Sequence, residues 1–292
     1  MKTFRLTFLS IFFCLFLISQ IRASDDLDRG IQLFNQGKFE QAKAFFQAMV
    51  DDENNAEANY YLGRVYFILN DDDKAVDYLE EAIDIDDSKA DYHFWLANAL
   101  GRNAQHSNVL KQAWLAHKIL KEFERIVELD PKNVKGHVGC ANFYLHAPSI
   151  MGGGLDKARK EAEILLKLDP MQGRLLLAAI FEKEGKTDLA EKEYAEYDKS
   201  FNDSTDNYRF YNQYGYFLLK QKKYDKAIEM FRKQVKLAPD KANPHDSLGD
   251  GLRAAGHIKE ALAEYKRAIQ IDPGLKASTE KIKELIAEQD KN

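Results

Sequence analysis

Residues 242–275, ANPHDSLGDGLRAAGHIKEALAEYKRAIQIDPGL, decide the fold of this chain. Gly249 is followed twelve residues later by Ala261, Tyr265 comes four residues after that, and Pro273 closes the stretch. A small residue such as Gly249 lets one helix approach another closely, and a proline ends a helix because the residue before it avoids the α region. The stretch therefore predicts two helices joined by a tight turn.

The same spacing recurs along most of the chain. Five copies keep the interval of twelve residues between the first two members: Gly30/Ala42/Phe46, Gly63/Ala75/Leu79, Ala178/Ala190/Tyr194, Gly215/Ala227/Phe231 and Gly249/Ala261/Tyr265. Two further copies, Ala97/Ile119/Phe123 and Ala141/Ala158/Ala162, have longer intervals. A period near 34 residues predicts a stack of helical hairpins, each of which buries its apolar face against its neighbours. Polar residues near the turns, namely Asp72 or Asp73, Thr187 and Asp225, are the predicted N-caps of the second helices.

These residues resemble the tetratricopeptide repeat (TPR) family. The resemblance is carried by Leu62-Gly63-x-x-Tyr66 with Ala75-x-x-x-Leu79, by Tyr214-Gly215 with Ala227-x-x-x-Phe231 and Pro239, and by Leu248-Gly249 with Ala261-x-x-x-Tyr265, Ala268 and Pro273. It implies an all-α fold, a right-handed α-solenoid of about seven helix-turn-helix repeats with a C-terminal capping helix. The expected repeats span residues 24–55, 56–89, 90–133, 134–170, 171–204, 208–241 and 242–275, and residues 276–292 form the capping helix and tail.

Two consecutive repeats are longer than the others. The interval from Ala97 to Ile119 has ten extra residues, and the added segment predicts a longer helical hairpin over residues 101–114. The interval from Ala141 to Ala158 has five extra residues. Its Gly152-Gly153-Gly154 predicts a loop, because consecutive glycines disfavour a helix. The array as a whole resembles exported bacterial TPR proteins with a lengthened third unit and a glycine-rich fourth.

Residues 1–23 have the pattern of a secretory signal peptide. Lys2 and Arg5 precede an apolar stretch over residues 6–21, and Ala23 stands before an acidic segment. The apolar stretch is short for a spanning helix, which needs about 20 residues. We expect cleavage after Ala23, export and a periplasmic location, without membrane insertion of the mature chain. An uncleaved anchor in the inner membrane is the alternative.

Charge and cysteine content limit the functions open to the mature chain. Removing residues 1–23 changes the formal net charge from −5 to −8. Such a balance argues against a nucleic-acid partner, since phosphate binding relies on basic surface. Cys140 is the one cysteine that remains after cleavage, so no intramolecular disulfide can form. Packing alone must hold the fold together.

No motif in the sequence predicts catalysis, a cofactor or a metal. Gly152-Gly153-Gly154 opens a helix, but Leu155-Asp156 follows where a phosphate-binding loop needs Gly-Lys-Ser/Thr, which favours a structural turn over an anion site. Cys140 lies beside Ala141 on a core-facing position, which favours packing over a nucleophilic role. Another set of residues, His93, His137 and His245, shares one position in the repeat but has no zinc-ligand spacing. We therefore expect a protein that is not an enzyme.

The TPR resemblance implies that the first helices line a concave groove. Its predicted contacts are basic, aromatic and amide side chains: Tyr60, Arg64, Phe94, Asn98, Arg102, Lys135, Asn142, His146, Lys183, Arg209, Asn212, Tyr216 and Lys220. Such a surface suits an extended acidic peptide or a C-terminal carboxylate. The sequence thus predicts an exported scaffold or adaptor that binds a protein or an extended, acidic peptide in its groove.

A second hypothesis uses the N-terminal end of the array. Leu27, Ile31 and Phe34 would form an apolar stripe on the open side of the first repeat. Such a stripe can dock another protein or a second copy of the chain. Under this hypothesis the protein is a structural subunit of an envelope assembly, or it self-associates.

Overall fold

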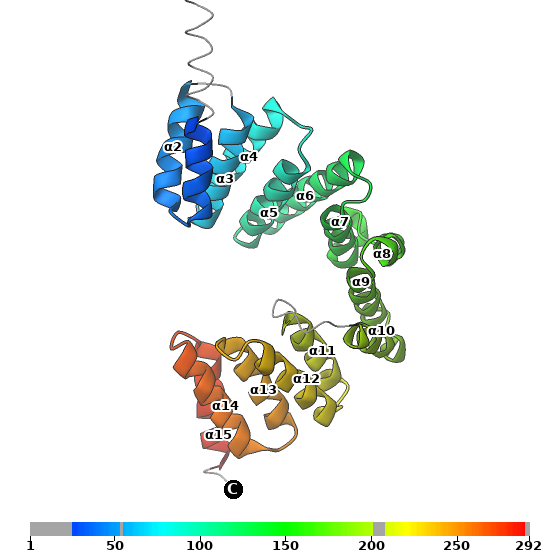
Figure 1. Ribbon diagram of the computed structural model, residues 1–292. Coiled ribbons are helices and arrows are strands. Elements are labelled where there is room, and N and C mark those ends of the chain that lie inside the picture. The colour runs from blue at the N-terminus through cyan, green and yellow to red at the C-terminus, as the bar shows by residue number, and fades with distance from the viewer. Residues whose placement is uncertain (1–24, 53–54, 201–207, 290–292) are drawn as a thin grey trace, which may run out of the picture. The chain divides into compact units, whose positions relative to one another are not determined.

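The computed structural model describes residues 25–52, 55–200 and 208–289, and most of these residues form helices joined by short connections (Figure 1). The predicted signal peptide over residues 1–23 lies outside the described residues. The chain divides into two compact units, one up to Glu184 and one from Gly185. Helices are the regular elements throughout the described ranges, so the predicted all-α repeat solenoid class is confirmed.

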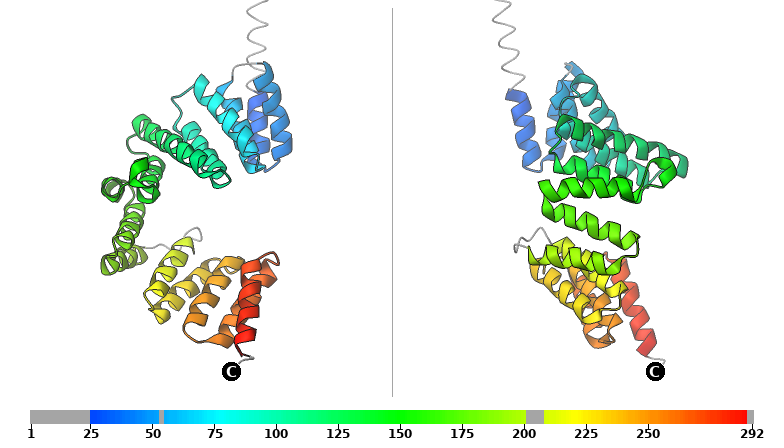
Figure 2. Two further views of the ribbon diagram at one scale, coloured as in Figure 1. Left: turned by 180° about the vertical axis from the view of Figure 1, so that it is seen from behind. Right: turned by 90° about the vertical axis from the view of Figure 1, so that its right-hand side faces the viewer.

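In the first unit, helical hairpins stack one on the next (Figure 2). Within hairpins, α3 packs on α4, α5 on α6 and α7 on α8, while the pairs α4–α5 and α6–α7 join one hairpin to its neighbour. The elements are a helix over residues 25–35, α2 (Phe39–Asp52), α3 (Ala56–Ile68), α4 (Asp72–Ile85), α5 (Ala90–Gln105), α6 (Val109–Leu129), α7 (Val134–His146), the 3₁₀ turn η1 (Ser149–Met151), α8 (Leu155–Leu168) and α9 (Pro170–Lys183).

The second unit has the same construction. Here α11 packs on α12, α13 on α14, and α12 on α13. Its helices are α10 (Thr187–Lys199), α11 (Tyr208–Lys220), α12 (Tyr224–Leu237), α13 (Ala242–Ala254), α14 (Ile258–Ile271) and α15 (Lys276–Gln289).

A left-handed residue ends the first helix of each regular repeat. Gly37, Asn70, Gly185, Lys222 and Gly256 all have φ between +58° and +86°. The residue after the turn donates its N–H back to a carbonyl five residues earlier, as His257 does to Leu252 at 2.9 Å. This is the Schellman ending of a helix, which satisfies carbonyls that would otherwise lack partners.

The turn geometry also corrects the predicted N-caps. The cap of α4 is Asp71, whose side chain accepts a hydrogen bond from the Lys74 N–H, while Asp72 and Asp73 lie in the first turn of the helix. Thr187 and Asp225 also lie inside their helices, and the preceding cap positions make no side-chain hydrogen bond. The second helix begins just after the left-handed turn residue in each case, and a side-chain cap is present at α4 but not at α10 or α12.

Close packing explains the small residues of the repeat. A Cβ atom added to Gly215 would lie 2.4 Å from the Phe231 ring, and one added to Gly249 would lie 2.5 Å from the Tyr265 ring. Both rings are fully buried. The prediction that these glycines mark close approaches between helices is therefore confirmed.

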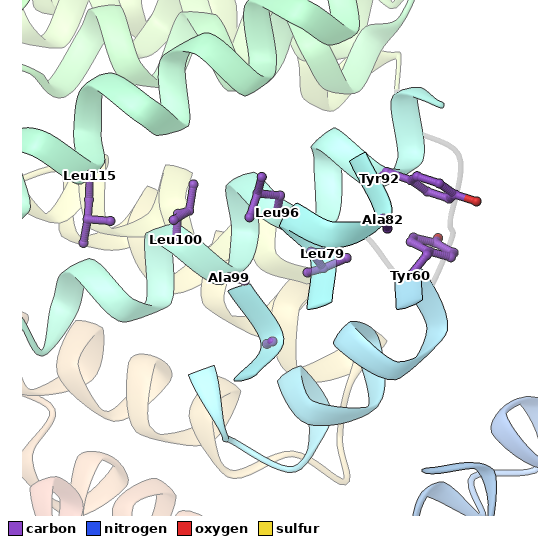
Figure 3. Packing of buried hydrophobic residues seen from close by; sticks show 9 residues of the cluster. Tyr60, Leu79, Ala82, Tyr92, Leu96, Ala99, Leu100 and Leu115 are labelled. Carbon is purple, nitrogen blue, oxygen red and sulfur yellow. The ribbon is translucent and has the colours of Figure 1, made fainter. Parts of the chain in front are cut away.

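The core also continues from one hairpin to the next. Figure 3 shows one such cluster, in which Tyr60 and Tyr92 lie side by side and Leu79, Leu96 and Leu115 fill the space along the helices. The two tyrosine rings stack with centroids 4.6 Å apart. Since Tyr60 belongs to α3 and Tyr92 to α5, this contact ties consecutive repeats together.

Both lengthened repeats have the predicted form. Helix α5 continues through Gly101 to Gln105, and α6 has 21 residues compared with 14 in α4. In the next repeat, residues 147–154 form a connection that contains the 3₁₀ turn η1. The predicted long hairpin and the predicted glycine loop are thus both present.

The C-terminal capping helix is fixed by a polar network. Helix α15 packs on α14. Its Ser278 hydroxyl donates to the Asp246 carboxylate at 2.5 Å, and its Lys281 ammonium lies 2.8 Å from Asp246 and 2.7 Å from Asp250. Because Asp246 and Asp250 belong to α13, these bonds anchor the cap to the last repeat.

Candidate functional site

The predicted groove residues of the first unit lie on successive first helices, where cations alternate with aromatic rings. Arg64 on α3 is the centre of the largest such group. Its guanidinium lies 4.5 Å from the centroid of Phe34, 4.7 Å from that of Trp95 and 5.1 Å from that of Tyr60. One Nη atom donates to the Tyr60 hydroxyl at 3.2 Å, while the buried Nε has no hydrogen-bond partner.

Arg64 also lacks an acidic partner. Among the described residues, no carboxylate lies within ion-pair distance of its guanidinium. Burial of the neighbouring Tyr60 raises the pKa of that hydroxyl to about 12, so Tyr60 remains a neutral ring at physiological pH. The arginine is therefore held by ring faces, which attract cations, and keeps hydrogen-bonding capacity for an anionic group.

Arg102, at the end of α5, is bonded within the repeat array. Its guanidinium pairs with the Asp72 carboxylate, donates to the Phe67 carbonyl, and lies 3.6 Å from the centroid of the Phe67 ring. It also donates to the Asn70 side chain at 3.3 Å. These contacts join α5 to the preceding turn, so Arg102 has a structural role in linking two repeats.

Lys135 repeats the pairing of cation and ring one repeat further on. Its ammonium lies 4.7 Å from the centroid of the Phe94 ring on α5, and the side chain is exposed. Of the other predicted contacts nearby, Asn98 donates to the Phe94 carbonyl at 2.6 Å. The face formed by Arg64, Lys135 and the rings of Tyr60, Phe94 and Trp95 is called the cation–aromatic face below.

The remaining predicted contacts of the first unit lie at the ends of α7 and α9. Asn142 and His146 are exposed, and Lys183 donates to the Leu145 carbonyl. Partial desolvation of the ring, together with the charge of Lys183, lowers the pKa of His146. His146 thus tends to be neutral near pH 7 and adds little positive charge to this end of the face.

The predicted contacts of the second unit largely serve its own structure. Tyr216 donates to Asp250 at 2.7 Å, and Asn212 accepts from Ser247 at 2.7 Å. Arg209 lies beside the Tyr208 ring, and Lys220 is exposed. Because Asp250 also binds the capping helix through Lys281, this surface is a network that holds α11, α13 and α15 together.

The apolar stripe of the second hypothesis lies mostly inside the protein. Phe34 is 8% exposed, and its ring packs against Phe39 and Tyr61. Leu27 and Ile31 are half-buried beside the same core cluster. Phe34 therefore contributes one wall of the Arg64 site and is not an open docking side chain.

The three buried histidines that share a repeat position each form the same pair of hydrogen bonds, one to a glutamate and one to a backbone carbonyl. This pair of bonds is called a histidine bracket below. His93 Nδ1 lies 2.6 Å from Glu122 Oε2, and its Nε2 lies 3.0 Å from the Asp87 carbonyl oxygen. His137 and His245 repeat this arrangement with their own partners, Glu161 with the Pro131 carbonyl and Glu264 with the Pro239 carbonyl. Each bracket ties a first helix to its second helix and to the preceding turn.

The sequence already carried a signal for these brackets. A glutamate stands at the same later position in each of the repeats that has the histidine, three residues after Ile119, Ala158 and Ala261.

The described cysteine is buried, and the described residues form no metal-binding cluster. Burial raises the pKa of the Cys140 thiol to about 12, so the reactive thiolate is not available at neutral pH. Over residues 25–52, 55–200 and 208–289, no cluster of three His, Cys, Asp or Glu side chains could hold a metal ion. None of the helices in these ranges is long and apolar enough to cross a membrane.

The glycine loop uses its own backbone donors. Gly152 N–H bonds to the Ser149 carbonyl, and Gly154 N–H bonds to the Tyr144 carbonyl at 2.8 Å. A Cβ atom at Gly153 would lie 1.9 Å from the Ala147 carbonyl oxygen, so only glycine fits there. The observed bonds are those of a structural turn.

Comparison with known proteins gives the same architecture. The family model for the tetratricopeptide repeat matches residues 27–90 and 207–273. A TPR repeat-containing protein of Methanocaldococcus jannaschii is 21% identical over 273 residues, which cover 90% of this chain and 45% of that protein. The chain therefore spans less than half the length of this relative.

Solved structures share the fold at low sequence identity. A tetratricopeptide repeat protein from Parabacteroides merdae has a TM-score of 0.68 at 12% identity and covers 90% of this chain and 98% of its own. The Cut9–Hcn1 hetero-tetramer of the APC/C has a TM-score of 0.58 at 13% identity, covering 88% of this chain and 48% of its own. With the repeated helix-turn-helix geometry and the matches at both ends, the chain belongs to the tetratricopeptide repeat family.

Proposed function

We propose that this protein is a non-catalytic scaffold that binds an extended acidic peptide segment of another protein along the cation–aromatic face. The TPR fold is that of a protein–protein interaction scaffold. The choice of an acidic peptide rests on Arg64, a guanidinium held among aromatic rings without a described carboxylate partner.

Charge and geometry support this partner. Arg64 is half-buried, with its Nε atom buried and unpaired, and an incoming carboxylate can pair bidentately with the guanidinium. Lys135 provides a second cation two repeats away on α7, beside the Phe94 ring of the repeat between them. A peptide with acidic side chains and apolar residues between them could pair with the cations and pack on the aromatic rings of this face.

The test is binding of fluorescent ten-residue peptides that differ in acidic content. The double change Arg64→Gln with Lys135→Glu is expected to weaken binding of acidic peptides by tenfold or more, because each lost ionic hydrogen bond is worth about 1.5–3 kcal/mol. Lys132→Glu is the matched control, since Lys132 is an exposed lysine outside the face. Binding that is equal for wild type and the double variant would refute the proposal.

The alternative role as an assembly subunit that docks through Leu27, Ile31 and Phe34 has less support. Phe34 is buried in the core of the first repeats, so a charged residue there would unfold the repeat before it tested docking. Leu27 is accessible enough for a mild change such as Leu27→Ser. Loss of partner capture in that variant, with peptide binding intact, would favour the alternative.

We also propose that the protein is exported to the periplasm. The support is the signal-peptide pattern of residues 1–23, which lies outside the described residues. N-terminal sequencing of protein isolated from its native envelope is expected to begin at Ser24. An intact Met1 would contradict cleavage and favour the uncleaved anchor.

A further inference from the structure

The lengthened repeats carry exposed apolar side chains at their ends. Val109 is 79% exposed, Leu110 84% and Trp114 61%, all in the first two turns of α6. Ile150, in the connection of the next repeat, is 96% exposed. Large apolar side chains that gather in this way indicate an interaction surface.

This surface projects beyond the rest of the first unit. Helix α6 is seven residues longer than α4, which at 1.5 Å per residue corresponds to about 10 Å. The extra turns are at the N-terminal end, where Val109 and Leu110 lie. The apolar side chains are therefore on a protruding tip.

Both sets of apolar side chains lie on one edge of the first unit. The starts of α5 and α7 are adjacent, since the Lys135 ammonium lies 4.7 Å from the Phe94 ring, and α6 packs on both helices. Because α5 and α7 run in the same direction, the α5–α6 and α7–α8 connections at their C-terminal ends lie on the same side of the first unit. The α3–α4 turn also meets the α5–α6 turn, as Asp72 and His106 line one surface depression.

The charge of this edge is unusual for an acidic protein. Residues 92–121 and 131–155 contain no Asp or Glu, although the whole chain has 47. Exposed Lys111 lies in the first turn of α6, exposed Lys121 lies further along the same helix, and exposed Lys157 follows the glycine loop next to exposed Asp156. Of the carboxylates in the adjacent turn, Asp71 pairs with Lys74 and Asp72 with Arg102, while Asp73 accepts a hydrogen bond from Asn103.

We propose that this edge, formed by Val109, Leu110, Trp114 and Ile150, inserts into the headgroup region of an anionic phospholipid bilayer. Interfacial segments bury apolar side chains about 5–10 Å deep, which matches the projection of the tip. Tryptophan favours this boundary because its ring is apolar while its N–H needs a polar partner. Lysines near an anionic surface add attraction.

A membrane fits this surface better than a protein partner. The exposed apolar residues are only four, three on α6 and one in the α7–α8 connection, whereas a protein interface of standard size needs about 800 Å² of complementary surface on each side. The contact is peripheral and leaves the helices of the first unit intact. It is independent of peptide binding, because it does not use the cation–aromatic face.

The test uses Trp114 as its own reporter. The chain has two tryptophans, so Trp95→Phe leaves Trp114 alone. Full-length protein is mixed with vesicles of phosphatidylglycerol and phosphatidylcholine that contain brominated lipid, which quenches tryptophan in the bilayer. With the anionic vesicles, we expect the Trp114 emission to shift to shorter wavelength and its intensity to fall at least twofold. Binding to vesicles of pure phosphatidylcholine is expected to be at least tenfold weaker.

Substitutions at the tip give the second readout. Val109→Ser with Leu110→Ser is expected to reduce the Trp114 quenching at a fixed lipid concentration by tenfold or more. Leu189→Ser is the matched control, because Leu189 is 44% exposed on α10, a helix of the second unit. The N-terminal apolar segment is the same in every variant, so differences between variants report the tip.

Two results would overturn the proposal. The first is sedimentation of the chain with vesicles while Trp114 stays unquenched, since the N-terminal segment alone would then hold the protein on lipid. The second is loss of a copurifying protein in the Val109→Ser, Leu110→Ser variant without any change in vesicle contact, which would assign the edge to a protein partner.

Discussion

Replacing Phe231 by Ala is expected to destabilise the second unit by about 4 kcal/mol, the typical cost of removing a fully buried aromatic side chain. The ring is 0% exposed. It fills the space beneath two glycines on different helices, because an added Cβ would lie 2.4 Å from it at Gly215 and 2.9 Å at Gly251. The cavity would therefore open between two repeats, where no single helix can close it.

Urea unfolding followed by two probes checks this expectation. Both tryptophans lie in the first unit, so their fluorescence reports that unit, while far-ultraviolet circular dichroism reports the whole chain. We expect an early circular-dichroism transition in Phe231→Ala and a smaller change in the fluorescence midpoint, since a repeat contacts only its neighbours. Leu189→Ala, at a partly exposed position, is the control and is expected to cost little.

The glycine beneath the ring provides an internal check. Gly215→Ala places a Cβ in the ring and is expected to cost about 1–3 kcal/mol through overpacking. The smaller side chain in Phe231→Leu leaves room for the added Cβ, so Gly215→Ala should cost less in that background. The double variant is therefore expected to lose less free energy of unfolding than the sum of the losses in the two single variants. Strict additivity would show that the ring does not press on Gly215.

Replacing His93 by Ala is expected to cost about 3 kcal/mol, because it leaves the buried Glu122 carboxylate without its partner. His93 is 3% exposed, and both of its ring nitrogens face oxygen acceptors. The ring must donate at both nitrogens to satisfy these bonds when Glu122 is ionised. Chemical denaturation at pH 7 measures the loss, with His257→Ala as the control at an exposed histidine.

The His93 bracket also predicts a pH dependence. Burial alone would lower the pKa of His93, but hydrogen bonds to Glu122 and to the Asp87 carbonyl raise it above its usual value near 6.5. Since the folded-state pKa is the higher one, this stabilisation is fully present below about pH 6.5 and is lost as pH rises through the folded-state pKa.

Glu122→Gln isolates that effect, because it removes the carboxylate and keeps a hydrogen-bonding side chain. The cost of the substitution is expected to be larger at pH 6 than at pH 9, and it can be measured from urea midpoints at the two values. A cost that is independent of pH would contradict a charged His93–Glu122 pair.

Much of the fold could be predicted because the repeat is a local rule. Positions such as Gly215 and Phe231 are sixteen residues apart in every regular copy, so the spacing alone identifies the two residues that pack together. The long hairpin and the glycine loop were also predicted, since extra residues and three glycines change the spacing visibly. The N-caps were predicted wrongly, because the second helix begins two residues after the left-handed turn residue, which places Asp72, Asp73, Thr187 and Asp225 inside the first turn.

The candidate site could be predicted only in part. Arg64, Arg102 and Lys135 look alike in the sequence as basic residues on first helices. The structure separates them, because Arg102 pairs with Asp72 from another repeat, whereas Arg64 meets rings and no described carboxylate. A partner about 30 residues away cannot be chosen from spacing, since several acidic residues stand at comparable distances along the chain.

The sequence by itself determined the family, the helical repeats, the positions of close helix packing and the two repeats that differ from the rest. These features depend on contacts within one repeat, and the period of the chain records such contacts directly. Only the tertiary structure decided which charged side chains are already paired, that Phe34 is buried and that Trp114 is exposed. Those properties depend on neighbours brought in by stacking, and the free energy of a charge or an apolar ring is set by those neighbours.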